Sequence, residues 1–258
     1  ADLKLESDSP TAETDAVLAP RMARQRFPLK GTCLAIYSRA VNTQWPIRKV
    51  LQEAFPWCLE HEDALKQLFA AYVDRKEQLG LLDYDDLLLW WAEMLGEPAL
   101  AAEVGGRFDF VLVDEFQDTN PLQARILQRL KPGGRGLTVI GDDAQAIFAF
   151  RGASVRNILD FPGTCDPPAA IVTLEENHRS TQPILDLANA VLRHATQGYR
   201  KTLRSARLSD QRPWLVVARD EVAQAAYVAE QVLATREAGV PLREQAVLVR
   251  TASHTARL

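Results

Sequence analysis

The 258-residue sequence contains only three cysteines and no long apolar run. Cys33, Cys58 and Cys165 lie far apart, and neither a CxxC pair nor a cysteine–histidine cluster accompanies them. A disulfide framework and a zinc site are therefore excluded, and we expect free thiols in a reducing cytoplasm. No stretch approaches the roughly 18 apolar residues that a membrane span needs, and the acidic N-terminus is not a signal peptide. We expect a cytoplasmic protein without membrane contact.

Positive charge is also scarce in this sequence. The 30 Lys and Arg residues are outnumbered by 34 Asp and Glu residues, which gives a formal net charge of −4. Because nucleic-acid-binding proteins are more often basic, this total counts mildly against nucleic acid, although it does not report local patches. The composition, 47% hydrophobic and 25% charged, excludes a mainly disordered chain. The length predicts one large domain or two smaller ones.

The first 105 residues are predicted to be helical after a loose lead-in over 1–30. A second helix of this region is expected to begin at Asp83, with Asp86 in its first turn, and to end at the Gly and Pro that follow it. Since its residues 87–91 are all apolar, we expect this helix to be buried. The helix before it has an apolar stripe at i, i+3 and i+4 spacing, made of Leu65, Leu68, Phe69, Tyr72 and Val73.

From residue 106 onwards, short apolar runs alternate with helical segments. Helices are expected after Asn120-Pro121, after Ser180 or Thr181, and over about 221–238. This alternation predicts an α/β fold with parallel βαβ units, and the Pro/Gly-rich stretch 161–168 is interpreted as a linker. The helix after Thr181 places one apolar face on Ile184, Leu187, Ala188, Val191 and Leu192. Strands are expected over 108–113, 137–140, 170–174, 214–218 and 245–249.

The residues that follow the first two strands are candidate site residues, because ligands of open parallel sheets bind beyond the carboxyl ends of the strands. The first strand ends in Asp114 and Glu115. The aspartate can hold Mg²⁺, and the glutamate can orient or deprotonate a water that attacks a γ-phosphate. The alternative is that these acids only cap a helix. The second strand leads to Gln145, a neutral group suited to sensing a phosphate.

Two further groups of residues extend this set of candidates. Phe148, Phe150 and Arg151 are typical of a stacking platform for unpaired bases, although one or both phenylalanines could instead be core residues. Arg179 stands just before a helix and could neutralise charge on a transferring phosphoryl group. The alternative for Arg179 is an ordinary surface residue that pairs with the neighbouring glutamates, Glu175 or Glu176.

Three segments carry a family resemblance in the right order. VDEFQDTN (113–120), VIGDDAQAIFAFRGA (139–153) and LEENHRST (174–181) resemble motifs II, III and IV of the UvrD/Rep/PcrA-type superfamily 1 DNA helicases. DYDDLL (83–88) resembles a segment that precedes motif II in that family. The resemblance implies incomplete RecA-like P-loop NTPase lobes with an all-helical insert. The implied parts are a 1B-like subdomain over 1–105, part of lobe 1A over 106–168, and the first part of lobe 2A over 169–258.

The resemblance also implies a role for each matching residue. Asp114 would coordinate Mg²⁺, and Glu115 would be the catalytic base of ATP hydrolysis. Gln145 would couple the γ-phosphate to the DNA site, and Arg179 would act like an arginine finger. The remaining matches would support or contact the nucleotide (Gln117, Asp142, His178) or touch single-stranded DNA (Phe148, Phe150, Arg151).

The sequence departs from the family pattern in several places, including Ala144, Ala146 and Ala149, which replace residues more often Asp or Val, Ser and Gly. His178 stands where Tyr is usual, and Phe150 stands where Trp is common. None of the 13 glycines is followed by Lys, so the GxxxxGK[ST] phosphate-binding loop is absent. We therefore expect an internal fragment of an ATP-dependent helicase, without ATPase activity of its own. The intact protein would move 3′ to 5′ on single-stranded DNA or at DNA junctions, in repair or recombination and with repair-protein partners.

Two other interpretations remain open at this point. One is a helicase-like DNA- or protein-binding module without a motor, against which the retained Asp114, Glu115, Gln145 and Arg179 argue. The other is the motor part of a helicase–nuclease. A fragment with missing strands would expose apolar sheet edges, so we also expect a tendency to form non-native dimers.

Overall fold

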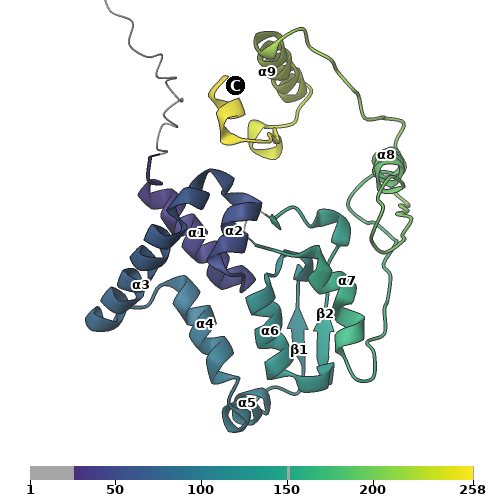
Figure 1. The fold of residues 1–258 in the computed structure, drawn as a ribbon. Helices are drawn as coiled ribbons and strands as arrows, with labels where there is room; N and C mark the ends of the chain where they lie inside the picture. Colours follow the sequence, from purple (N-terminus) through teal and green to yellow (C-terminus); the bar gives the residue numbers. More distant parts are fainter. Residues whose placement is uncertain (1–25, 150–151, 258) are drawn as a thin grey trace, which may run out of the picture. The chain divides into compact units, whose positions relative to one another are not determined.

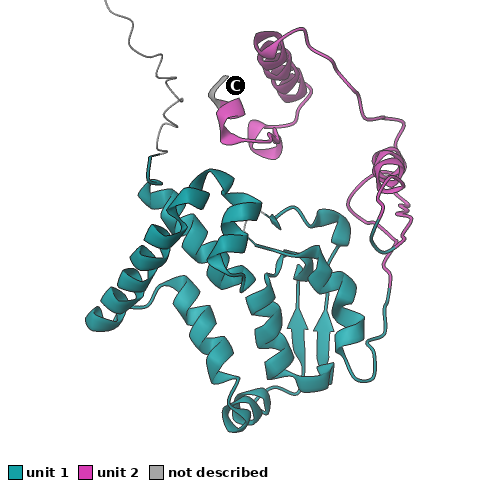
Figure 2. Cartoon of the chain, in the orientation of Figure 1, with its two compact units in different colours: residues 1–172, 197–199 teal, residues 173–196, 200–258 magenta. Residues whose placement is uncertain are grey.

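The computed structural model describes residues 26–149 and 152–257. Residues 1–25 of the expected lead-in over 1–30 lie outside the described residues, as do two of the expected DNA-contacting residues, Phe150 and Arg151. The chain divides into two compact units (Figure 2). Unit 1 comprises residues 1–172 and 197–199, and unit 2 comprises residues 173–196 and 200–258.

The N-terminal part of unit 1 is helical, as the sequence predicted. A first core cluster lies under the N-terminal helices, and the expected stripe contributes Leu65 and Phe69 to it, whereas Leu68 is exposed. The other buried members of this cluster are Cys33, Ile36, Val50, Leu51 and Cys58. The helices are α1 (Lys30–Thr43), α2 (Ile47–Ala54), α3 (Glu62–Leu79), α4 (Tyr84–Met94) and α5 (Pro98–Gly105), with a 3-10 helix η1 (Pro56–His61) before α3 (Figure 1).

Helix α4 begins where the sequence predicted but is not buried all round. The Asp83 side chain accepts the N–H of Asp86, and the Asp86 side chain accepts the N–H of Asp83, which forms a complete capping box. The expected burial of residues 87–91 is wrong, because Leu87, Trp90 and Trp91 are exposed. Only one face of α4 packs inward, where Ala92 joins a second core cluster with Leu95, Leu122, Ile126 and Leu130.

A parallel βαβ unit completes unit 1 and confirms the predicted α/β class. Strand β1 (Val111–Val113) pairs in parallel with β2 (Leu137–Val139), with Val111 opposite Leu137. Helix α6 (Pro121–Leu130) connects the strands, and its predicted start is confirmed by a capping box between Asn120 and Gln123. Short 3-10 helices follow β1, α6 and β2: η2 (Phe116–Asp118), η3 (Pro132–Gly134) and η4 (Asp143–Gln145).

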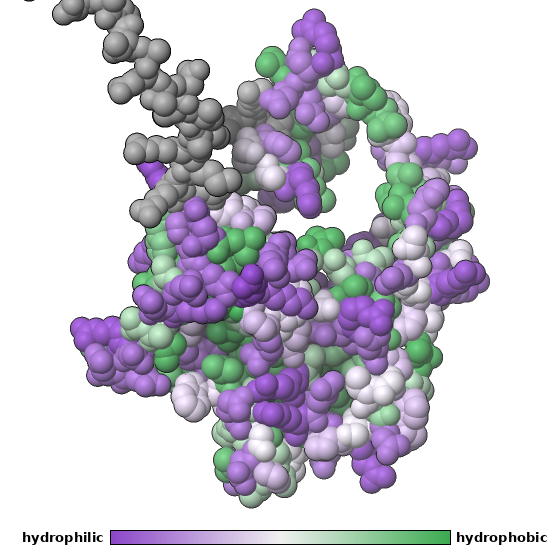
Figure 3. Space-filling view, viewed as in Figure 1, coloured by the Kyte–Doolittle hydropathy of each residue, from purple (hydrophilic) through white to green (hydrophobic). Residues whose placement is uncertain are grey.

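The two strands are covered on one side and remain partly open. Helices α6 and α7 (Val155–Thr164) flank them in Figure 1, and a third core cluster forms around Phe116, Ile158 and Phe161. Phe110, which precedes β1, and Leu112, which lies in β1, are exposed. On the face shown in Figure 3, apolar areas lie between polar ones. The stretch 161–168, expected as a linker, is helical as far as Thr164.

Unit 2 contains two of the expected helices but none of its expected strands. The predicted helix over 221–238 is confirmed as α9 (Glu221–Glu237), and α8 (Gln182–Leu192) begins after Thr181. The strands expected over 170–174, 214–218 and 245–249 are wrong. Outside the β1–β2 ladder, the described residues form only an isolated bridge between Glu176 and Arg204. An apolar run becomes a strand only beside a partner, and the described chain supplies none here.

The remaining elements of unit 2 are short. The 3-10 helices η6 (Leu242–Glu244) and η7 (Ala252–Arg257) follow α9. Helix α8 buries Leu185 and Asn189, while Ile184, Leu187 and Val191 of the expected apolar face are exposed. No helix in the described part of the chain is long and apolar enough to cross a membrane.

Candidate functional site

The carboxyl end of β1 presents two neighbouring exposed carboxylates, those of Asp114 and Glu115. The Asp114 Oδ1 atom accepts the N–H of Glu115 at 2.9 Å. Glu115 adopts a left-handed backbone conformation with φ 50° and ψ 42°, which is uncommon for a residue other than Gly, Asn or Asp. Glu115 is the N-cap residue of η2, but its side chain makes no capping hydrogen bond there, and the cap of α6 is Asn120.

A continuous hydrogen-bonded path joins Glu115 to the end of β2. The buried amide of Gln117 donates from Nε2 to Glu115 Oε2 at 2.7 Å, and its Oε1 accepts the N–H of Asp142 at 3.0 Å. Asp142 Oδ2 in turn accepts from Gln145 Nε2 at 2.8 Å. A carboxylate only accepts and a peptide N–H only donates, so these partners fix the orientation of the Gln117 amide.

Parallel pairing is the reason that these residues meet. Beyond the ladder, Ile140 donates its N–H to the Val113 carbonyl at 2.7 Å, and Phe116 donates to the Ile140 carbonyl at 2.9 Å. Gly141 is required in this arrangement, because a Cβ atom there would lie 2.5 Å from Gln117 Oε1. The structure therefore brings together four residues predicted for the site, Glu115, Gln117, Asp142 and Gln145, with Asp114 next to them.

The expected DNA-contacting residues are only partly described. Phe148 follows η4 and is half-buried. Its expected companions, Phe150 and Arg151, lie outside the described residues. The stacking platform therefore stays a prediction from the sequence.

Arg179 and His178 belong to unit 2, where both side chains are exposed. The Asn177 Oδ1 atom accepts the N–H groups of Arg179 (3.0 Å) and Ser180 (2.7 Å), which shapes the turn before α8. Within the described residues the Arg179 guanidinium makes no ion pair. Glu175, its predicted alternative partner, binds the Arg204 side chain at 3.4 Å instead.

The sequence did not predict a polar link between the site and the helical region. Asn120, at the end of motif II, donates from Nδ2 to Asn42 Oδ1 at 2.8 Å, and both residues are buried. Asn42 then donates from Nδ2 to Asp85 Oδ1 at 2.7 Å. The family resemblance singled out the acidic DYDDLL segment, but the sequence did not indicate its partner Asn42, which lies 43 residues from Asp85.

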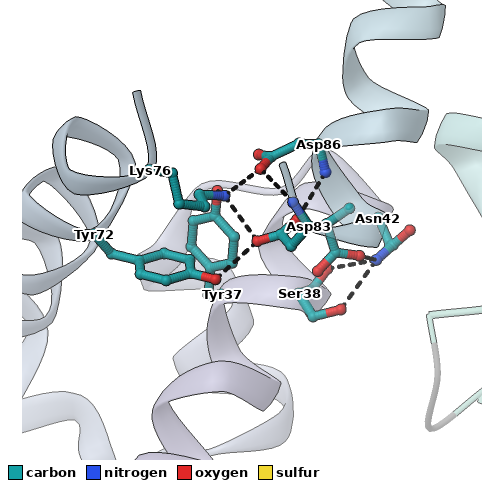
Figure 4. A network of polar contacts seen from close by, with 8 residues as sticks. Tyr37, Ser38, Asn42, Tyr72, Lys76, Asp83 and Asp86 are labelled. Carbon is teal, nitrogen blue, oxygen red and sulfur yellow. Dashed lines mark hydrogen bonds and ion pairs between the residues drawn. The ribbon is translucent and has the colours of Figure 1, made fainter. Parts of the chain in front are cut away.

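A second unpredicted network lies between α3 and the start of α4 (Figure 4). The buried Lys76 ammonium binds Asp83 Oδ2 at 2.7 Å and Asp86 Oδ2 at 2.6 Å, and Tyr72 donates to Asp83 at 2.9 Å. Burial alone would lower the pKa of Lys76, but the bonds to the two carboxylates outweigh burial and raise this pKa above its ordinary value. Lys76 also lies over the rings of Tyr37 and Tyr72.

Together, the parallel unit and its strand-end carboxylates define an incomplete RecA-like α/β lobe with a helical part attached to it. The description "UvrD/REP helicase N-terminal domain" matches residues 13–166, and "UvrD-like helicase C-terminal domain" matches residues 172–258. The chain therefore belongs to the UvrD/REP helicase family, which confirms the resemblance found in the sequence.

Individual relatives support the same family. The ATP-dependent DNA helicase UvrD2 of Mycobacterium tuberculosis is 40% identical over 188 residues, which is 70% of this chain and 26% of the relative. DNA helicase II of Escherichia coli K12 is 33% identical over 195 residues, 74% of this chain and 26% of the relative. PcrA of Staphylococcus epidermidis, an ATP-dependent DNA helicase, is 31% identical over 192 residues. The chain thus spans about a quarter of the length of the curated relatives it matches.

Proposed function

We propose that this chain is part of an ATP-dependent DNA helicase that couples ATP hydrolysis to movement on single-stranded DNA. The observation that carries the proposal is the path Glu115–Gln117–Asp142–Gln145, which connects two motifs at neighbouring strand ends. Such a path suits an ATP hydrolase in which the proposed γ-phosphate sensor, Gln145, is linked by hydrogen bonds to the proposed catalytic base, Glu115. The names of the relatives, all DNA helicases, support this choice of substrate.

Glu115 is the proposed general base. Its exposed carboxylate takes a proton from a water whose oxygen forms a bond to the γ-phosphorus. The bond from that phosphorus to the bridging oxygen breaks, and its electron pair leaves with ADP. Gln117 holds the glutamate through Oε2 and leaves Oε1 available for the water. Gln145 is proposed to sense the γ-phosphate from the next strand end.

The donor set at the end of β1 fits a hard divalent cation. One oxygen of Asp114 accepts a peptide N–H, and the exposed carboxylate keeps its other oxygen available. Mg²⁺ is commonly held by one or two carboxylates together with substrate phosphates. Asp114 would hold Mg²⁺, which when bound would neutralise phosphate charge.

The remaining assignments follow from the motif matches. We propose that Arg179 neutralises charge on the transferring phosphoryl group, that His178 stacks on adenine, and that Phe148, Phe150 and Arg151 contact unpaired bases. The intact protein would act with 3′ to 5′ polarity on DNA strands or junctions during repair or recombination, in the cytoplasm and with repair proteins. Exposed Phe110 and Leu112 favour self-association of the chain when it is alone.

The decisive test uses the full product of the gene that encodes this chain. Glu115→Gln removes the base without changing its size, and we expect DNA-stimulated ATP hydrolysis to fall by about 10²–10⁴-fold while ATP binding remains. Glu53→Gln, an exposed residue of α2, is the matched control and should leave the rate unchanged. Full activity of Glu115→Gln would refute the assignment. The 258-residue chain alone should hydrolyse no ATP, because it lacks a GxxxxGK[ST] loop.

A further inference from the structure

We propose that Tyr199 is a positioning residue for the turn that carries Gln145, an inference that rests on the proposed function. Residues 197–199 belong to compact unit 1, although the chain on both sides of them belongs to unit 2. Tyr199 packs against the third core cluster of unit 1, which consists of Phe116, Ile158 and Phe161. Phe116 is part of motif II, so the ring of Tyr199 supports the same core on which the catalytic strand end lies.

The hydroxyl of Tyr199 fills a gap in the hydrogen bonding of α7. In an α-helix the carbonyl of Ile158 would accept the N–H of residue 162, but residue 162 is a proline and has no N–H. The Tyr199 hydroxyl lies 3.2 Å from the Ile158 oxygen and 3.4 Å from the Leu159 oxygen. It has one hydrogen to donate, and the shorter distance favours the carbonyl of Ile158, whose usual helical donor is missing.

The backbone of the same residue holds motif III. The N–H of Tyr199 donates to Asp143 Oδ2 at 3.2 Å. The preceding residue, Gly198, has φ 129°, and a Cβ atom there would overlap the Asp143 carboxylate, so only glycine fits this approach. Asp143 opens η4, the turn that ends at Gln145. One residue thus bonds both to α7 and to the first residue of the phosphate-sensing turn.

The electrostatic setting keeps the phenol in its donor form. Burial raises the pKa of Tyr199, and the negative charges of Asp143 and Asp160 raise it further. The hydroxyl therefore donates at neutral pH. If Tyr199 were only a filler of the core, neither the glycine before it nor the bond to Asp143 would be needed. These contacts indicate that Tyr199 holds the turn in place through Asp143. The neighbouring Asp142 in turn binds the side chain of Gln145.

The test compares Tyr199→Phe, which removes only the hydroxyl, with Tyr227→Phe in α9. Among the described residues, no hydrogen bond involves the Tyr227 hydroxyl, so the second variant is a matched control. In the full gene product without ATP, we expect amide hydrogen exchange over residues 142–146 to become about tenfold faster in Tyr199→Phe. Without its hydroxyl, residue 199 is no longer held to α7, and the bond from its N–H to Asp143 opens more often. Exchange in α3 should not change, and Tyr227→Phe should match the wild type throughout.

A second readout separates positioning from plain stability. At a temperature where both variants are folded, Tyr199→Phe should lower kcat for DNA-stimulated ATP hydrolysis several-fold, with KM for ATP within about twofold of wild type. Unchanged exchange over 142–146 would overturn the proposal, and so would faster exchange with unchanged kcat. If the wild-type protein itself hydrolysed no ATP, the proposed function would fail, and the exchange over 142–146 would alone decide whether Tyr199 braces the turn.

Discussion

Units 1 and 2 contain similar apolar runs, yet only unit 1 turns them into a sheet. Val111–Val113 pairs with Leu137–Val139. Two core clusters pack against this ladder, and a third lies among the N-terminal helices. In unit 2, Leu215 and Leu248 lie in runs of the same kind and are more than 90% exposed. Only Leu185 and Asn189 are buried among the described residues of unit 2. The difference shows that a strand depends on its neighbour rather than on its own composition.

Hydrogen exchange should reveal the largest difference between the two units. We expect the amides of 214–218 and 245–249 to exchange at least about a thousandfold faster than those of β2, because local opening free energies range from near zero up to the global stability. Mass spectrometry of the 258-residue chain would measure this. Comparable protection in both sets would mean that the runs of unit 2 have strand partners after all.

The next largest effect is expected at the buried ion pair of unit 1. Lys76→Met should destabilise unit 1 by about 3–5 kcal/mol, because two carboxylates, those of Asp83 and Asp86, lose their shared cation. Denaturant unfolding followed by circular dichroism would measure the change. The matched control is Lys66→Met on the same helix, where an exposed lysine pairs with Glu62.

Lys66→Met should leave unit 1 unchanged, because exposed ion pairs of this kind add little to stability. An equal effect of the two substitutions would show that burial of Lys76 is unimportant. In unit 2, α8 and α9 should keep their exchange rates in both variants, since Lys76 belongs to unit 1.

The smallest expected effect is an acid sensitivity of unit 1 that depends on Asp83. Burial opposes the ionised form of Asp83, but the hydrogen bonds from Lys76, the Asp86 backbone and Tyr72, together with the charge of Lys76, outweigh burial and lower the pKa of Asp83 below its ordinary value. The stabilisation is therefore present above about pH 4, the ordinary aspartate value, and is lost as pH falls through the lowered pKa. Urea midpoints measured from pH 7 to pH 3 should fall at the acid end, and the fall should be weaker in Asp83→Asn. A fall of equal size in both would exclude Asp83 as the cause.

The features that could be predicted from the sequence are local or follow from strand order. The capping boxes at Asp83 and Asn120 depend on side chains three residues apart, so the sequence displays them directly. The link from Glu115 to Gln145 through Gln117 and Asp142 follows because parallel strands end on the same edge of a sheet. Residue type and strand position suggested nucleotide and DNA roles, and the family resemblance made those roles specific.

The features that could not be predicted depend on partners far apart in the chain. Nothing near Asn42 marks it as the partner of Asn120, 78 residues away. Nothing in the sequence marks Lys76 as the buried partner of Asp83 and Asp86. The apolar residues 87–91 of α4 were expected to be buried, yet several of them are exposed. In each case the burial and the partners of the residue depend on which other element packs against it. Periodicity within one segment does not indicate which element that is.

The left-handed backbone of Glu115 lowers the stability of the fold at a position whose carboxylate is proposed to be needed for catalysis. A side chain in this conformation costs about 1 kcal/mol or more relative to glycine, and asparagine also tolerates it. Random substitution selected only for a more stable protein would therefore favour Gly or Asn at position 115 and discard the carboxylate. In libraries of variants, the glutamate should persist where turnover is selected and disappear where only folding is selected, so its retention reports on selection for activity.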